Sequence, residues 1–142
     1  MSWLRRAVQG VRDALTPGSG GERPAPFTLD VEARRAQLEE LERALDRLIE
    51  TMRANHERMA NPGWRERVAE YRRLSGEAYT LRRGGFDRER LLDLAFEIRP
   101  VFPGDDLPED VQPIQPLQEE LMRAARALQE ELPGERPTPS DA

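Results

Sequence analysis

The sequence predicts an all-α protein built on an antiparallel helical hairpin of coiled-coil type, with two additional helices. Apolar residues recur every three or four positions in several separate segments, which is typical of amphipathic helices. No segment shows a convincing strand alternation, and glycine and proline clusters separate the periodic stretches. An N-terminal amphipathic helix on a flexible linker and a disordered C-terminal tail are expected on either side of this helical domain.

The first expected element is a short amphipathic helix over residues 1–16. Its apolar side chains recur at helical spacing, whereas its arginines lie elsewhere on the circumference. The residues expected to dock on a membrane or on the rest of the protein are Trp3, Leu4, Val8, Val11 and Leu15. Residues 17–28 are rich in glycine and proline, so we expect a flexible linker that leaves this helix free to move.

A long helix is expected over about residues 30–60, with Asp30 as its N-cap. Its apolar residues follow a seven-residue repeat, which is the pattern of a coiled-coil seam. One seam position holds Val31, Leu38, Leu45, Met52 and Met59, and the other holds Arg34, Leu41, Leu48 and Asn55. Asn55 either fixes the register of the seam or is exposed near the turn that follows.

Asn61, Pro62 and Gly63 interrupt this pattern, so a second helix over about residues 64–83 should fold back antiparallel. A return helix of about 20 residues is shorter than the helix it covers. The hairpin alone therefore leaves Val31, Leu38 and Leu41 uncovered. Only a helix expected further along the chain, over about residues 116–132, the N-terminal helix or a second molecule can then cover them.

Two further helices are expected over about residues 87–99 and 116–132, which completes a helical domain over 29–132. The first of them is apolar around most of its circumference, which favours a central position. The segment between them contains four prolines and should be extended. Residues 133–142 contain almost nothing to bury and are expected to form the disordered tail.

Charge alternates in sign along the chain, whose net charge is −5. The simplest interpretation places the basic helix 64–83 between the acidic helix 30–60 and the acidic C-terminal third. The arginines of helix 64–83 could instead form a phosphate-binding strip, as in a nucleic-acid-binding helical protein. The net negative charge argues against nucleic acid as the main partner.

The search for catalytic chemistry yields no candidate residues. His56 and Glu57 begin a paired-histidine zinc motif, but Ala60 stands where the second histidine is required. His56 is the only histidine in the chain, so it is expected to be a solvated helix residue. We expect no enzyme activity, no cofactor and no metal site.

These observations favour a non-catalytic interaction or adaptor module that uses the heptad face of helix 30–60. The expected partner-binding residues are Val31, Leu38 and Leu41, and the partner is another protein or a second copy of the chain. The alternative is a peripheral membrane protein anchored by its N-terminal helix. The expected location is the cytoplasm, with or without attachment to the membrane surface.

Overall fold

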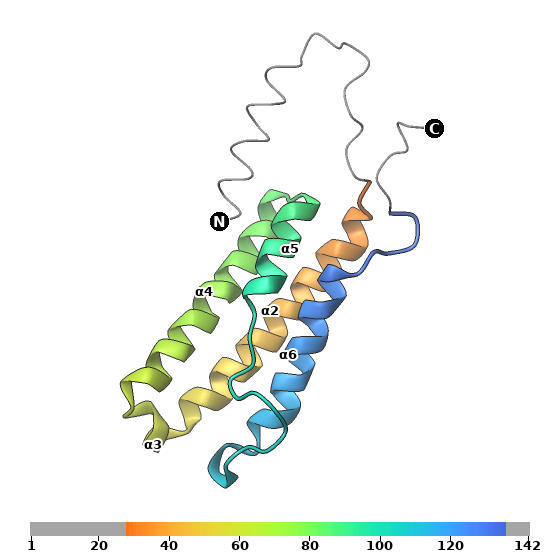
Figure 1. Ribbon diagram of the computed structural model, residues 1–142. Helices are drawn as coiled ribbons and strands as arrows, with labels where there is room; N and C mark the ends of the chain where they lie inside the picture. The colour runs from red at the N-terminus through yellow and green to blue at the C-terminus, as the bar shows by residue number, and fades with distance from the viewer. Residues whose placement is uncertain (1–27, 136–142) are drawn as a thin grey trace, which may run out of the picture.

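The computed structural model describes residues 28–135, and this part of the chain is helical and contains no β-strand. The first helix described, α2 (Val31–Ala54), begins where the Asp30 carboxylate accepts a hydrogen bond of 3.1 Å from the Ala33 amide. It packs along α4 on one side and α6 on the other (Figure 1). The central helix is therefore α2, which corrects the expectation that the helix near residues 87–99 is central.

The long helix expected over 30–60 is interrupted at Asn55. The Asn55 side-chain oxygen accepts a hydrogen bond of 3.1 Å from the Arg58 amide and so caps a separate short helix, α3 (His56–Met59). An asparagine side chain competes with the backbone for these hydrogen bonds, which is why it favours caps over helix interiors. The expectation of one continuous helix to residue 60 was wrong for this reason.

The return helix α4 (Pro62–Gly84) is longer than expected and runs antiparallel to α2 (Figure 1). Its first turn tolerates Pro62 because the first helical amides need no partner within the helix. Its other end reaches the start of α2, where the Arg35 Nε donates a hydrogen bond of 3.1 Å to the Arg82 carbonyl. Because α2 ends at Ala54, the two helices have nearly the same length, and the expected mismatch does not exist.

The helix α5 (Arg88–Glu97) begins at Asp87, whose carboxylate accepts a hydrogen bond of 2.8 Å from the Arg90 amide. It packs mainly against α6. Phe96 is 64% exposed, so one side of α5 faces outward. The segment that follows buries apolar side chains against the core and includes the short 3₁₀ helix η2 (Glu109–Val111). Its buried residues are Ile98, Val101, Leu107 and Val111.

The last helix, α6 (Ile114–Gln129), runs antiparallel to α2 and covers its N-terminal half (Figure 1). Leu38 and Leu41 are each 0% exposed, because α6 and the end of α4 both pack over this part of α2. The expectation that they offer surplus apolar surface was therefore wrong. Of the three predicted partner-binding residues only Val31 is exposed, at 45%.

Ion pairs connect α2 to both of its neighbours. Arg82 of α4 lies 3.0 Å from Glu42, and Arg47 of α2 lies 2.7 Å from Glu120 of α6. Opposite charges thus pair between helices, but the order of helices differs from the expected one, since α2 rather than the basic α4 lies in the middle. The Arg47–Glu120 pair is largely exposed and the Arg82–Glu42 pair is part-buried. Exposed ion pairs contribute little to the stability of a fold, so burial of the apolar stripes decides the arrangement.

Candidate functional site

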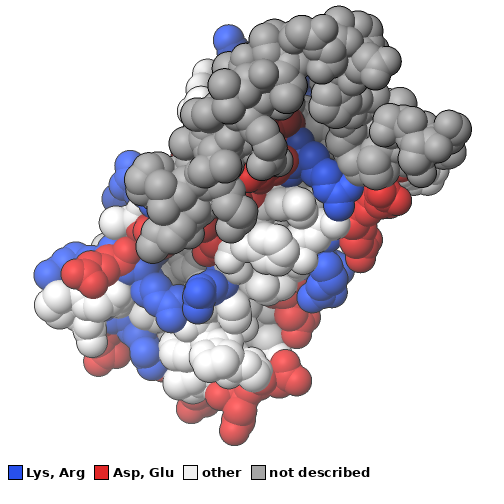
Figure 2. Space-filling view, turned by 45° about the horizontal axis from the view of Figure 1, so that its top comes forward, with Lys and Arg blue, Asp and Glu red and all other residues white. Residues whose placement is uncertain are grey.

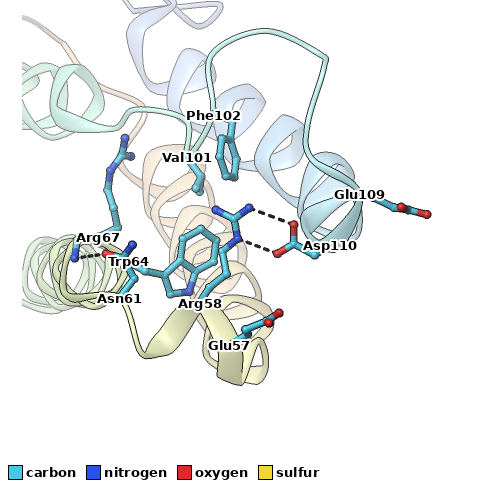
Figure 3. A pocket seen from close by; sticks show the side chains of 10 residues that line it. Glu57, Arg58, Asn61, Trp64, Arg67, Val101, Phe102, Glu109 and Asp110 are labelled. Carbon is cyan, nitrogen blue, oxygen red and sulfur yellow. Dashed lines mark hydrogen bonds and ion pairs between the residues drawn. The ribbon is translucent and has the colours of Figure 1, made fainter.

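A hollow of about 810 Å³ lies at the end of the bundle where α2 passes into α3 (Figure 3). It opens widely to solvent. Its walls come from α3, the start of α4, the segment after α5, and η2. The lining residues are Glu57, Arg58, Asn61, Gly63, Trp64, Arg67, Val101, Phe102, Glu109 and Asp110.

The floor of the hollow is an arginine in contact with two aromatic rings. The Arg58 guanidinium carbon lies 5.4 Å from the centre of the Trp64 ring and 5.6 Å from that of Phe102. The two rings are 6.2 Å apart at an interplanar angle of 43°. A cation at this distance from a ring face is attracted by the ring's quadrupole. We call Arg58, Trp64 and Phe102 the aromatic–arginine cluster.

Trp64 is fixed by a hydrogen bond as well as by packing. It is only 7% exposed, and its indole N–H donates a hydrogen bond of 3.0 Å to the Met52 carbonyl. Met52 lies in the last turn of α2, and its carbonyl also accepts a hydrogen bond of 3.3 Å from the Asn55 N–H. The indole N–H is thus a second donor to this carbonyl at the end of α2, and the small exposed part of Trp64 lines the hollow.

Phe102 is held by Gln118, a buried residue of α6. The Gln118 amide accepts a hydrogen bond of 3.0 Å from the Phe102 N–H and donates one of 2.8 Å to the Phe102 carbonyl. This side chain pairs with the backbone of the irregular segment much as a neighbouring strand would. It fixes the segment, and with it the position of the Phe102 ring above Arg58.

Asp110 fixes the orientation of Arg58. Its carboxylate accepts hydrogen bonds of 2.7 Å from the Arg58 Nε and 3.0 Å from Nη2, which is the bidentate geometry (Figure 3). The Asn55 side-chain amide donates a further hydrogen bond of 3.2 Å to the same carboxylate. The hydrogen bonds from Arg58 lower the pKa of Asp110 to about 2, and that from Asn55 adds to the effect. Both members of the pair are therefore charged at neutral pH.

Charged side chains surround the aromatic–arginine cluster. Arg67 stands at one wall and donates a hydrogen bond of 3.1 Å to the Pro100 carbonyl. Glu57 and Glu109 lie on the rim and point away from its centre (Figure 3). Both are exposed, and neither forms an ion pair within residues 28–135. The geometry provides an apolar and cationic floor with exposed carboxylates at its edge.

Comparison with protein-family models, with curated protein sequences and with solved structures finds no match to this chain. The proposal for its function therefore comes from the geometry of the described residues.

The predicted docking residues lie away from the hollow. Leu38 and Leu41 belong to the core, and Val31 lies at the start of α2, at the other end of the bundle (Figure 1). The membrane or docking residues Trp3, Leu4, Val8, Val11 and Leu15 lie outside the described residues.

Two of the six arginines of helix 64–83, which could form a phosphate-binding strip, already form ion pairs. Arg82 pairs with Glu42, and Arg73 lies 2.8 Å from Glu70 and 3.5 Å from Glu97. On the face shown in Figure 2, acidic and basic side chains are interspersed outside the grey atoms rather than gathered by sign. This face offers no continuous basic track for a nucleic-acid backbone.

The remaining sequence hypotheses concern His56 and the membrane. His56 is exposed, as expected for a solvated helix residue. Within residues 28–135, no group of three or more histidine, aspartate or glutamate side chains is placed to hold a metal ion. No helix in the same range combines the length and the apolar character needed to cross a bilayer.

Sequence reasoning missed the site because its members come from four separate parts of the chain. Trp64 was considered as part of a buried stripe or as a ring that could stack on a base, and Asp110 as one of four acidic residues in the proline-rich segment. Arg58 and Phe102 were not singled out. An aromatic residue inside a proline-rich segment was the one available signal for Phe102. No sequence signal was available for Arg58, because nothing near it in the sequence indicates that its guanidinium packs against Trp64 and Phe102.

Proposed function

We propose that this chain is a non-catalytic protein-interaction module that binds a basic, apolar segment of a partner protein in the hollow at the α3 end of the bundle. The observation that supports the proposal is the aromatic–arginine cluster itself. Tryptophan, arginine and other aromatic residues carry a disproportionate share of the binding energy at protein interfaces. Here they converge in one concave surface instead of being dispersed.

The rigidity of the cluster supports the same proposal. Arg58 is held by Asp110, Trp64 by the Met52 carbonyl and Phe102 by Gln118. Side chains that are already fixed lose little conformational entropy when a partner binds. The charged network thus adds to affinity indirectly, because it orders the contact surface before binding.

Charge complementarity indicates a basic partner. Glu57 and Glu109 are exposed on the rim, and Asp105 and Asp106 are exposed in the loop between Phe102 and Glu109. Arg67 contributes one positive charge beside these four carboxylates, so the rim stays acidic in balance. A partner segment with an apolar side chain over the cluster and lysine or arginine beside it would pair with these carboxylates.

Site-specific photocrosslinking in cells that express the protein tests the proposal. A photoreactive residue at Arg67 or at Glu109 should capture the same protein, whereas one at Arg43, on the exposed side of α2, should not. The captured protein is then purified and titrated calorimetrically against the parent chain. It is also titrated against the Glu57→Arg/Glu109→Arg variant, for which we expect at least about tenfold weaker binding.

Two results would overturn the proposal. One is that a photoreactive residue at Arg43 captures the same proteins as one at Arg67 or Glu109, because the hollow would then not be selective. The other is unchanged affinity after the double charge reversal in a variant that is still folded. If the only crosslinks formed are to a second copy of the chain, the hollow serves self-association and the proposal of a basic partner is wrong.

A further inference from the structure

The last described residues form a strap at the end of the bundle opposite the hollow (Figure 1). After α6 ends, Glu130 is extended, and Gly134 adopts a positive φ of 90° that lets the chain turn back. Glu135 then inserts its side chain beside the start of α2, and the residue is only 3% exposed. Residues 133–135 were expected to belong to a disordered tail with nothing to bury, so this placement corrects that expectation. We call residues 130–135 the C-terminal strap.

Four N–H groups converge on the Glu135 carboxylate. Arg34 donates from Nη2 to one oxygen at 2.6 Å and from Nε to the other at 2.9 Å. The Leu132 amide donates to the first oxygen at 3.0 Å, and the Asp30 amide donates to the second at 2.8 Å. Each oxygen thus accepts two hydrogen bonds, which is a complete set for a buried carboxylate.

The Arg34 side chain that binds this carboxylate is held in place largely by contacts with α2 and α6. The Arg34 Nη1 donates to the Gln37 side chain at 2.9 Å and to the Ala127 carbonyl at 3.2 Å. The Arg34 Nη2 donates to the Glu130 carbonyl at 2.6 Å. Arg34 is itself only 2% exposed. The guanidinium therefore keeps its orientation through contacts that do not involve Glu135.

Electrostatics favour a charged occupant. Burial acts to raise the pKa of Glu135, but the hydrogen bonds from Arg34 and from the Asp30 and Leu132 amides outweigh it, so the pKa is lowered. A buried arginine left without an anion is strongly destabilising. The site around Arg34 therefore requires a carboxylate, and the strap supplies it.

We infer that Arg34 and the Asp30 amide form a carboxylate-binding site that the chain fills with its own Glu135. The ligand class is a carboxylate, and the site accepts a small carboxylate anion once Glu135 is absent. Occupied by Glu135, the site acts as a clasp. It holds the start of α2 and the end of the strap together at one end of the bundle (Figure 1).

Chemical rescue tests the inference. The Glu135→Ala variant is melted in sodium formate and in sodium chloride at the same ionic strength, with far-ultraviolet circular dichroism as the readout. We expect its Tm to lie below that of the parent chain in chloride. The Tm of Glu135→Ala should rise with the formate concentration, because a ligand that binds only the folded state stabilises that state by mass action.

Matched variants separate binding from a general salt effect. Glu131→Ala removes the neighbouring carboxylate, which is half-exposed and lies 3.8 Å from Arg88, and its Tm should not depend on formate. The Arg34→Met/Glu135→Ala double variant lacks the guanidinium and should not be rescued. If Glu135→Ala does not fold in chloride, the same titration is followed as recovery of helical signal.

The inference fails if formate leaves Glu135→Ala unchanged, or if it raises the Tm of Glu131→Ala or of the double variant equally. This outcome is independent of the proposed docking function, because the clasp and the hollow lie at opposite ends of the bundle. Loss of partner binding in the hollow would leave the rescue intact.

Discussion

Replacing Leu41 by alanine tests whether the N-terminal half of α2 is covered by its own chain. Leu41 is 0% exposed in a single chain, between α4 and α6. The substitution removes three carbon groups, which at about 0.8 kcal/mol each corresponds to about 2.4 kcal/mol of lost burial. The cavity left behind adds to this, so the total loss should be about 3 to 4 kcal/mol. The Tm should then fall by about 10 °C or more.

The control is Val31→Ala on the same helix, because Val31 is 45% exposed. Its effect should remain within about 0.5 kcal/mol of the parent chain. Thermal unfolding followed by circular dichroism at widely separated protein concentrations provides the measurement. If α4 and α6 of the same chain cover this part of α2, the Tm of the parent chain and of each variant should not depend on protein concentration, because no association is coupled to folding.

Two results would refute this reasoning. A loss for Leu41→Ala as small as that for Val31→Ala would mean that α6 and α4 do not enclose the residue in solution. A Tm that rises with concentration in the parent chain would show that a second copy contributes to the fold. The second result would also restore the hypothesis that the heptad face of α2 serves association.

Three other substitutions follow from specific contacts. Asn55→Leu should destabilise the protein by about 0.5 to 2 kcal/mol in chemical denaturation, because it removes the cap of α3; stabilisation would restore the register hypothesis. Trp64→Phe should cost at least about 1 kcal/mol in the same assay, since the Met52 carbonyl loses its indole donor; an unchanged midpoint would contradict that hydrogen bond. Glu135 has a lowered pKa in the folded state, so its stabilisation is complete above the pKa of the unfolded chain and is lost as pH falls through the folded value. Glu135→Gln should therefore flatten the acid side of a Tm-against-pH profile, and an equally steep profile would count against a charged Glu135.

Local patterns in the sequence predict the helices well because the relevant interactions are short-ranged. Asp30 and Asp87 act as caps, and the glycines after residue 83 end α4, as expected from residue type alone. The heptad of α2 also identifies its buried face, since an amphipathic helix must bury its apolar stripe. The buried apolar residues of the seam are Leu38, Leu41, Leu45, Leu48 and Met52.

The errors arise where a polar side chain has a partner distant in sequence. Asn55 was considered as a seam residue, but its cap of α3 and its contact with Asp110 end α2 early. That early end equalises α2 and α4 and removes the uncovered surface on which the heptad-face hypothesis depended. Arg34 was noted as a polar residue on the seam, but its partner Glu135 lies in a segment that was expected to be disordered.

The sequence by itself determined the helical class and the buried face of α2, because spacing along a helix fixes which side chains share a face. Only the tertiary structure decided the order of the helices, the clasp and the hollow. Each depends on groups that meet after chain segments far apart in sequence have packed together, as Arg58 does with Phe102 and Asp110. Hydrogen bonds and cation–ring contacts are directional and short-ranged, so no pattern in the linear sequence records which distant partner completes them.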